Sequence, residues 1–326
     1  MILTKLFPHL RRPNCLVAAF FALAACGMSL YSFLNPSYPI HARGTVLITG
    51  ASTGIGRHAA VHLATTRPAL TVLAGVRKPA DAASVLQEGL SNLRPILLDV
   101  TDAASIASAA AALAQSAEPL IGLVSNAGLA AGPTTVEYHD LGEARRLFDV
   151  NFFGALAVTQ ALLPLLRASE GRLVAVSSVF GAVSPPMGGV YAASKFALEA
   201  AHDSLRRELA AANVSVSIVA PGAVATPIFR TLESASLASS VARQLPAVAV
   251  YPHLYTPKDI ENEVKIEQMA DAPSVTTAAI DHALFAQHPR TRYFCANILG
   301  APAWLLALLA KVLPTRLMDI VMLQKG

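Results

Sequence analysis

Short apolar runs alternate with longer helical patterns from residue 44 to residue 296 of this 326-residue chain. Almost every position in these runs is hydrophobic, which is typical of strands buried on both faces of a parallel sheet. Seven runs have this pattern: 45–49, 70–76, 94–100, 121–128, 171–178, 214–222 and 292–296. The stretches between them, such as 102–115 and 191–212, are Ala-rich and have helical spacing. The alternation predicts an α/β domain built on a doubly wound parallel sheet with helices on both faces.

The N-terminal segment has a different pattern. Three cations and no acidic residue precede an apolar run of 20 residues, Cys15–Leu34. As a helix, this run spans about 30 Å, the thickness of the hydrocarbon core of a bilayer. It predicts an N-terminal transmembrane helix in a single-pass membrane protein. A cleaved secretory signal is an alternative, since "LAAC" at 23–26 resembles a lipoprotein cleavage site, and a transit peptide or a helix packed on the domain are others.

Residues 35–39, "NPSYP", contain two prolines and predict a linker after the apolar helix. Three cations precede the apolar run and only Arg43 follows it closely. The positive-inside rule therefore favours a cytosolic N-terminus, with the α/β domain on the opposite side of the membrane. The side of the membrane on which the domain lies stays open.

Composition narrows the class of partner. Hydrophobic residues make up 54% of the chain and charged residues 14%, so some apolar surface is expected to meet lipid or a lipid-like ligand. The net charge of +4 is not gathered into a basic run, which excludes nucleic acid as an expected partner. The three cysteines form no CxxC pair, and His58 and His62 lack a third ligand, so no metal site is predicted.

The stretch "TGASTGIG", residues 49–56, lies between an apolar run and a helical pattern. A strand, a glycine turn and a helix start gather unpaired backbone N–H groups at the positive end of the helix, which favours a pyrophosphate. Gly50 permits the tight turn, Gly54 lets the backbone approach the phosphates, and Gly56 lets the helix lie close to the strand. This position of the motif predicts a Rossmann-type dinucleotide site.

The residues after the second apolar run bear on the choice of dinucleotide. NAD sites usually place a carboxylate here for the ribose 2′-hydroxyl. This chain has Arg77 and Lys78 instead, and its first acid is Asp81. A guanidinium pairs well with a 2′-phosphate, so NADP(H) is expected in preference to NAD(H).

A second group of residues carries candidate chemistry. Tyr191 and Lys195 are four apart in a helical pattern and therefore share one face. An ammonium beside a phenol stabilises the phenolate, so Lys195 is expected to lower the pKa of Tyr191 into the range of general acid–base catalysis. Ser178 ends the preceding apolar run, at the sheet edge where such folds bind ligands.

Seven segments together form a specific pattern: "TGASTGIG" (49–56), "LDVTD" (98–102), "NAG" (126–128), "VNFFG" (150–154), "SSVFG" (177–181), "YAASK" (191–195) and "APGAVATPI" (220–228). This pattern resembles the short-chain dehydrogenase/reductase family from about Gly44 to the C-terminus. One departure is Ser125, where the family more often has a second Asn before "NAG". The resemblance implies an NADP-dependent oxidoreductase acting on CH–OH groups.

The resemblance also implies roles for individual residues. Tyr191 passes a proton to or from the substrate oxygen, and Ser178 orients the carbonyl. Lys195 holds the nicotinamide ribose, and Asn151 anchors the water through which this lysine exchanges protons. Asp99 faces adenine and Thr226 holds the carboxamide. The cofactor residues implied are Gly50, Ser52, Thr53, Gly54, Ile55, Gly56, Arg77, Asp99, Val100, Asn126, Ala127, Gly128, Tyr191, Lys195, Pro221, Gly222, Val224 and Thr226.

Within the family, the chain looks most like the membrane-associated branch that acts on retinoids, steroids and similar lipid alcohols. We expect a membrane anchor and linker (1–43), a catalytic domain (44–300) with an apolar substrate-binding insertion (227–275), and an apolar helical tail (301–326). In a eukaryote the expected membrane is the endoplasmic reticulum.

Several alternatives stay open. The tail either lies at a membrane interface or packs over the pocket or a second subunit. The substrate could be a more polar or acyl-linked carbonyl compound, or the chain could be a nucleotide-sensing protein without turnover. Relatives usually dimerise through the helix around 195–209, so a homodimer is possible. Neither the exact substrate nor the physiological direction can be read from the sequence.

Overall fold

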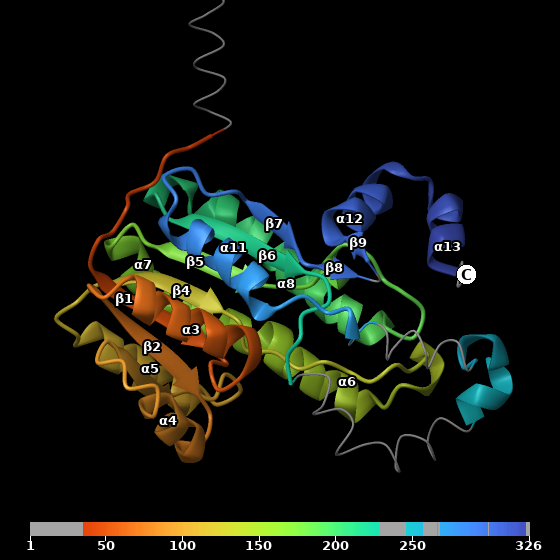
Figure 1. Ribbon diagram of the computed structural model, residues 1–326, viewed down its shortest axis with the longest axis horizontal. Coiled ribbons are helices and arrows are strands. Elements are labelled where there is room, and N and C mark those ends of the chain that lie inside the picture. The colour runs from red at the N-terminus through yellow and green to blue at the C-terminus, as the bar shows by residue number, and fades with distance from the viewer. Residues whose placement is uncertain (1–34, 228–245, 257–265, 267, 299, 324–326) are drawn as a thin grey trace, which may run out of the picture. The chain divides into compact units, whose positions relative to one another are not determined.

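The computed structural model describes residues 35–227, 246–256, 266, 268–298 and 300–323 (Figure 1). The apolar segment ending at Leu34, for which the sequence predicts a membrane helix, lies outside the described residues, as does much of the predicted 227–275 insertion. The compact α/β unit begins at Pro39.

The centre of this unit is a seven-stranded sheet in which every pairing is parallel. Its strands follow the order β3-β2-β1-β4-β5-β6-β7. They are β1 (Gly44–Thr49), β2 (Leu70–Val76), β3 (Leu93–Leu97), β4 (Leu120–Ser125), β5 (Arg172–Val176), β6 (Ser215–Pro221) and β7 (Arg292–Cys295). The direction of strand addition reverses between β1 and β4, which opens a ligand crevice at their carboxyl ends. The doubly wound parallel sheet predicted from the sequence is confirmed.

Helices cover both faces of the sheet (Figure 1). One face packs against α3 (Gly54–Thr66) and α11 (Pro273–Phe285), and the other against α5 (Ala103–Ala114), α7 (Ala155–Ala168) and α8 (Gly189–Glu208). The remaining helices are α4 (Pro79–Leu86), α6 (Leu141–Phe148), α12 (Ala303–Val312) and α13 (Thr315–Leu323). Short turns of helix are η2 (Val136–Tyr138), η3 (Asp149–Gly154), η4 (Val179–Gly181), η5 (Ala210–Ala212) and η6 (Pro252–Leu254).

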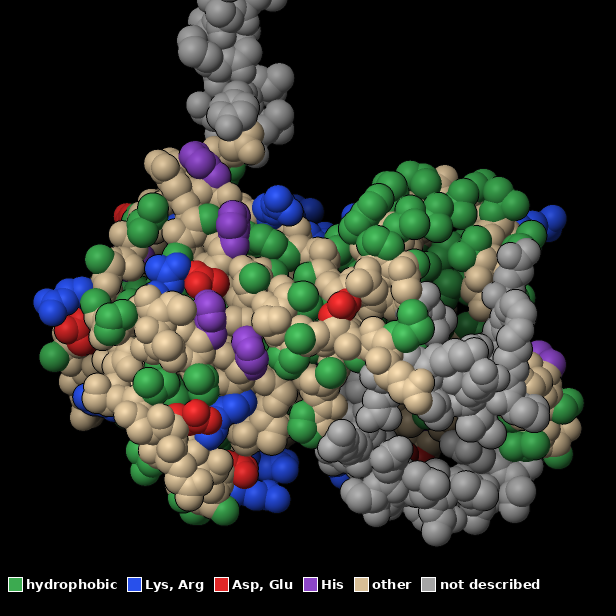
Figure 2. Space-filling view, in the orientation of Figure 1, with side chains coloured by type: hydrophobic (Ala, Val, Ile, Leu, Met, Phe, Trp, Pro, Cys, Tyr) green, Lys and Arg blue, Asp and Glu red, His purple; other side chains and the backbone are tan. Residues whose placement is uncertain are grey.

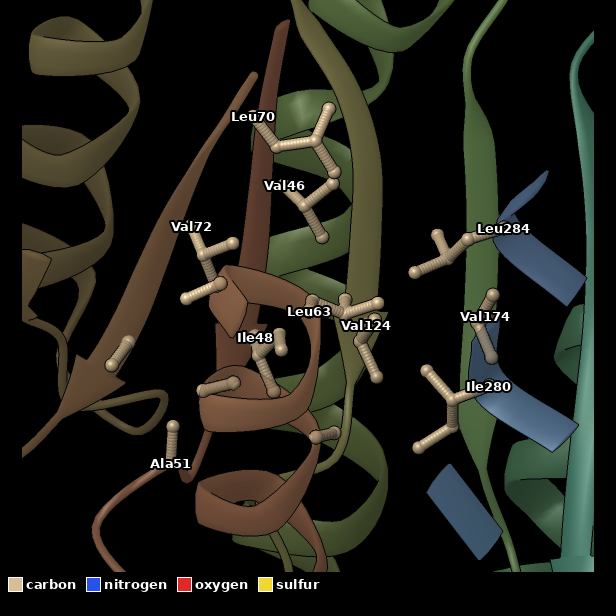
Figure 3. Close-up of a cluster of buried hydrophobic side chains, with 14 of the residues drawn as sticks. Val46, Ile48, Ala51, Leu63, Leu70, Val72, Val124, Val174, Ile280 and Leu284 are labelled. Atoms are coloured by element: carbon tan, nitrogen blue, oxygen red, sulfur yellow. The ribbon is translucent and has the colours of Figure 1, made fainter. Parts of the chain in front are cut away.

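The strands alternate their side chains between two cores. In β1, Val46 and Ile48 lie in the cluster under α3 and α11, which Figure 3 shows, whereas Leu47 lies in the cluster on the other face. All six residues of β1 are buried. Burial on both faces explains why the strand sequences are continuously apolar instead of alternating.

A short feature after β7 is not apparent from the sequence. Strands β8 (Asn297–Ile298) and β9 (Ala301–Pro302) pair antiparallel in a hairpin whose Gly300 has a φ of +78°. Two-residue strands show no periodicity, so only the glycine marked this turn.

The described residues contain one helical stretch long and apolar enough to cross a membrane, Leu141–Ala168. It comprises α6, η3 and α7, and α7 packs against the sheet in the core formed with α5. This stretch therefore has the contacts of a core helix.

The start of β5 is tied to the linker by a buried arginine. Arg172 is 1% exposed, and its Nη2 donates to the carbonyl oxygens of Pro39, at 2.8 Å, and Ala286, at 3.1 Å. Pro39 precedes β1, and Ala286 follows α11 before β7 begins. The chain thus enters the sheet at the amino ends of the strands, opposite to the crevice.

Candidate active site

The glycine turn between β1 and α3 has the backbone that the sequence predicts. Gly50 and Gly54 have φ angles of +64° and +57°, which favour glycine. A Cβ on Gly50 would lie 2.7 Å from Cα of Ala127, and one on Gly54 would lie 3.2 Å from Cβ of Thr226. A Cβ on Gly56 would lie 2.5 Å from the Gly50 carbonyl oxygen. The turn therefore packs tightly against the segments that follow β4 and β6.

The remaining residues of the turn leave the start of α3 accessible to an anion. Thr53 is the N-cap residue of α3, yet its side chain makes no capping hydrogen bond, and the first turn carries no acidic residue. Ser52, Thr53 and Ile55 are all at least partly exposed. The backbone N–H groups at this helix end can therefore bind a phosphate.

A hydrogen-bond cluster joins this turn to the end of β4. The hydroxyl of Thr49 accepts from the backbone N–H groups of Asn126 and Ala127, both at 3.0 Å. The Asn126 amide donates to the carbonyl oxygens of Thr49, at 2.9 Å, and Gly50, at 3.2 Å. Asn126 therefore holds the glycine turn in place, and Thr49 is a supporting residue that the sequence analysis missed.

Charged groups lie at the ends of β2 and β3. Arg77 is exposed directly after β2, and Asp99 and the buried Val100 follow β3. Burial acts to raise the pKa of Asp99, but hydrogen bonds from the side chain and backbone of Thr101 and the charge of Arg77 hold it below its ordinary value. Asp99 and Arg77 are thus close enough to interact electrostatically, one as an anion and the other as a cation.

The segment after β6 is held by two residues distant in the sequence. Asp271 Oδ2 accepts from the backbone N–H of Asn297, at 2.6 Å, and from its amide, at 3.0 Å. The Asn297 carbonyl accepts from Ala223 N–H at 2.7 Å, and Val224 forms a β-bridge with Asp271. This bracing fixes the segment that carries the predicted cofactor residues Pro221, Gly222, Val224 and Thr226.

Asn151 lies in η3, a π-helical turn between α6 and α7. Such turns often occur at functional sites. The Asn151 Oδ1 accepts from Leu129 N–H at 2.7 Å, and its Nδ2 donates to the Leu129 carbonyl at 3.0 Å and to Ser194 Oγ at 3.1 Å. Ser194 Oγ in turn donates to the Tyr191 carbonyl at 2.7 Å. Asn151 thereby connects the segment after β4 to the helix that carries Tyr191.

The structure brings the four predicted catalytic residues to one edge of the sheet. Lys195 and Asn151 are buried, and a Cβ on Gly128 would lie 3.6 Å from Lys195 Nζ and 3.3 Å from Asn151 Oδ1. Lys195 Nζ lies 5.8 Å from the centre of the Tyr191 ring, and a hydrogen bond joins Tyr191 to the Ser178 side chain. A phenol, an ammonium and a hydroxyl therefore lie together at this edge of the sheet.

The titration of Tyr191 differs from the expectation. Burial raises the pKa of Tyr191 to about 12, and the hydrogen bond with Ser178 offsets this only in part. Burial also lowers the pKa of Lys195 to about 8, against the charge of Glu199, which raises it. The predicted lowering of the Tyr191 pKa by Lys195 is therefore not found in this structure: burial dominates the shift, and Lys195 is not among the groups that contribute to it. At neutral pH, Tyr191 is a neutral phenol.

The supporting residues that the sequence analysis missed all act through hydrogen bonds to distant parts of the backbone. Thr49 and the Asp271–Asn297 pair act through hydrogen bonds to backbone atoms far away in the chain. The position of Thr49, directly before the glycine turn, was the one available signal for it. His58 and His62 instead bond Thr277 and Asp281 of α11, at 2.8 and 3.1 Å, which is a helix–helix contact.

A glycine turn at the switch point of a doubly wound sheet, with a tyrosine–lysine pair at the same edge, defines a dinucleotide-dependent oxidoreductase. Comparison with known proteins identifies the family. Residues 44–237 match the model described as short chain dehydrogenase, and the chain belongs to that family.

The relatives narrow the branch of the family. Retinol dehydrogenase 5 of Mus musculus is 39% identical over 289 residues, which cover 85% of this chain and 87% of the relative. The 17-beta-hydroxysteroid dehydrogenase type 6 of Bos taurus is 31% identical over 282 residues, with the same two coverages of 85% and 87%. The crystal structure of a short chain dehydrogenase from Burkholderia cenocepacia in complex with NADP superposes with a TM-score of 0.63 at 25% identity, covering 87% of this chain and 98% of that one. The chain is thus an oxidoreductase related to retinol and steroid dehydrogenases.

Proposed function

We propose that this protein transfers a hydride between NADP(H) and a lipophilic alcohol, ketone or aldehyde of the retinoid or steroid type. The observation that carries the proposal is the group formed by Ser178, Tyr191 and Lys195 at the sheet edge beside the glycine turn. The relatives named above, retinol and hydroxysteroid dehydrogenases, support the choice of substrate class.

The residues present fit a dinucleotide. The start of α3 has no side-chain cap and no acidic residue in its first turn, so its backbone N–H groups are available to a pyrophosphate. Arg77 and Lys78, both exposed, would hold a ribose 2′-phosphate, and Asp99 with Val100 would face the adenine. The segments 126–128 and 221–226 would hold the nicotinamide end. When bound, the nicotinamide supplies or accepts the hydride.

The protein's own part in the reaction is proton transfer. In the reducing direction, the neutral Tyr191 phenol donates its proton to the substrate oxygen while the Ser178 hydroxyl holds that oxygen in position. The Lys195 ammonium stabilises the negative charge that develops there and would hold the nicotinamide ribose. In the oxidising direction the same proton returns to Tyr191. Asn151 would support this exchange by anchoring a water molecule near Lys195, although its amide already bonds Leu129 and Ser194.

The apolar surface supports a lipophilic substrate and a membrane location. Figure 2 shows hydrophobic side chains gathered over α12 and α13. The exposed ones are Trp304, Leu305, Leu308, Val312, Leu317, Ile320, Val321 and Leu323. Lys311 and Arg316 lie among them, a pattern typical of a helix at a membrane interface.

The apolar surface beside the tail also includes a cavity. A groove of about 470 Å³ lies between α13 and the 182–189 segment that leads into α8.

We propose a single-pass protein of the endoplasmic reticulum membrane if the host is eukaryotic. The exposed Phe196 on α8 and Phe153 near α6 suit a homodimer contact.

The experiment that tests the function is NADPH oxidation at about neutral pH by detergent-solubilised protein, with retinal, steroid ketones and medium-chain aldehydes as substrates. Turnover with NADPH that Tyr191→Phe loses supports the proposal. Tight NADPH binding without turnover on any of them favours a nucleotide-sensing protein, and turnover confined to polar or acyl-linked carbonyl compounds contradicts the substrate class.

A further inference from the structure

Glu199 occupies the same face of α8 as the tyrosine and the lysine of the site. The three residues Tyr191, Lys195 and Glu199 are spaced by four, so each lies one helical turn from the next. Glu199 is only 6% exposed. Carboxylates are rarely buried to this extent unless they are paired, so the contacts of Glu199 need an explanation.

Glu199 contacts two other elements of the fold. Its Oε2 accepts from Nη2 of Arg292, on β7, at 2.8 Å. Its Oε1 faces the turn after β5: a Cβ on Gly181 would contact this oxygen and would lie 2.7 Å from Ser177 Oγ. Ser177 directly precedes Ser178. The Glu199 carboxylate on α8 therefore bonds β7 and lies against the turn that carries the Ser178 hydroxyl.

Among the residues that the structure describes, few charged groups lie around Lys195. The titratable groups of α8 on this side are Tyr191, Glu199, His202 and Asp203, and β7 contributes Arg292. Strand β5 contributes the Val176 carbonyl, which accepts from Lys195 Nζ at 3.2 Å, and η3 contributes the Asn151 amide.

The effects of these charges on Lys195 have opposite signs. Burial opposes its ammonium form, and Glu199 supports it. His202 is buried and bonds the Leu198 carbonyl, and its pKa is lowered by that burial, so it adds no positive charge there at neutral pH. Glu199, one helical turn from Lys195 on the same face of α8, is thus the group that supports the Lys195 ammonium. Burial raises the pKa of Glu199, and the charge and hydrogen bond of Arg292 act against this rise and favour its anionic form.

We propose that Glu199 is a positioning residue for catalysis: held by Arg292, its carboxylate keeps Lys195 protonated and keeps the Ser178 turn against α8. The inference rests on the proposed roles of Tyr191 and Lys195. It adds a residue to the four predicted catalytic residues, Asn151, Ser178, Tyr191 and Lys195. It also gives β7 a part in the reaction, because Arg292 fixes the orientation of the Glu199 carboxylate.

The test is the pH profile of kcat for carbonyl reduction by the full-length protein in detergent, for wild type, Glu199→Gln and Asp203→Asn. Glutamine keeps the shape and an acceptor for Arg292 but removes the charge. Asp203 also pairs with Arg292, at 3.4 Å, but is not among the groups that shift the Lys195 pKa, so Asp203→Asn is the matched control. Loss of an anion destabilises the ammonium, so the alkaline limb of the profile is expected to move to lower pH by about one unit in Glu199→Gln and to stay in place in Asp203→Asn.

A profile of Glu199→Gln that superposes on wild type overturns the inference. If that variant does not fold, the double change Glu199→Gln with Arg292→Gln removes both charges of this ion pair, and Asp203 keeps Arg206 as its partner at 2.9 Å. The same downward shift is expected for it, and an unshifted limb again overturns the inference. Tyr191→Phe, measured alongside, distinguishes failure of the proposed function from failure of the role of Glu199. An active Tyr191→Phe variant contradicts the proposed function. An inactive Tyr191→Phe variant together with an unshifted Glu199→Gln profile contradicts only the role of Glu199.

Discussion

The side-chain amide of Asn151 bonds both backbone groups of Leu129, accepting from its N–H at 2.7 Å and donating to its carbonyl at 3.0 Å. The two residues lie on segments that follow different strands, and Asn151 extends the connection through Ser194 to the backbone of Tyr191. The geometry at the crevice therefore depends on one amide held in an irregular helical turn.

Asn151→Ala is expected to lower kcat by about a hundredfold, because small displacements of reacting groups have effects of this size. The measurement is steady-state kinetics with NADPH and a retinoid or steroid carbonyl substrate. Ser194→Ala removes only one of the three bonds and is expected to cost less. Equal losses in the two variants would mean that the contact with Leu129 contributes little.

Tyr191→Phe removes the proton donor and is expected to reduce kcat by about 10² to 10⁴ while NADPH binding, followed by fluorescence, is retained. Tyr293→Phe is the matched control: this partly buried hydroxyl accepts from Arg290 N–H at 2.8 Å and lies 2.8 Å from His282 Nδ1, away from the crevice. Its loss is expected to lower Tm by about 2 to 4 °C without changing kcat. Near wild-type turnover in Tyr191→Phe would exclude the mechanism.

The pH dependence of carbonyl reduction is expected to follow Lys195. Burial raises the pKa of Tyr191 to about 12, so the phenol keeps its proton through the neutral range. Burial lowers the pKa of Lys195 to about 8, so its ammonium is lost as pH rises through that value. The kcat of wild type should therefore decline above about pH 8. A rate that stays flat well into the alkaline range would show that the lysine charge is not needed.

The free energy of unfolding should rise with pH over the range in which kcat falls. The pKa of Lys195 is lowered in the folded protein from 10.5 to about 8, so burying its ammonium opposes folding fully below about pH 8, and this cost disappears as pH rises towards 10.5. Lys195→Met is therefore expected to raise the free energy of unfolding at pH 7, by at most about 3 kcal/mol, while abolishing turnover. Urea denaturation of both proteins at about pH 7 and pH 10 measures this difference in the free energy of unfolding. An equal difference at the two pH values would show that it does not come from burial of the Lys195 charge.

Cofactor choice is expected to depend on Arg77. Arg77→Ala should weaken NADPH binding by about tenfold to a hundredfold, the scale of one charge-assisted hydrogen bond, and leave NADH binding unchanged. The exposed Arg94, on β3, is the control, and its change to alanine should affect neither nucleotide. Binding is measured by titration of intrinsic fluorescence. Parallel losses for both nucleotides would indicate a contact elsewhere than the 2′-phosphate.

The parts of the fold that were predictable depend on local sequence. Continuous apolar runs located all seven strands of the sheet, and the glycine turn located the crevice. The contacts that Thr49 and Asp271 make could not be predicted, because they join segments that only the folded chain brings together. The direction of the Tyr191 pKa shift was mispredicted for a related reason: the spacing of Tyr191 and Lys195 gives their proximity but not the depth at which they are buried.

The bond between Arg172 and Pro39 decides where the chain can be shortened. A protein that begins at Pro39 keeps the carbonyl to which this buried guanidinium donates, and the compact unit begins at the same residue. One that begins at Gly44, the first residue of β1, removes that acceptor from a side chain that is 1% exposed. The Ala286 carbonyl still accepts from this guanidinium, so one hydrogen bond to a buried charged group is lost, which costs about 1.5 to 3 kcal/mol. Five residues of linker therefore belong to the folding unit, although no strand or helix includes them.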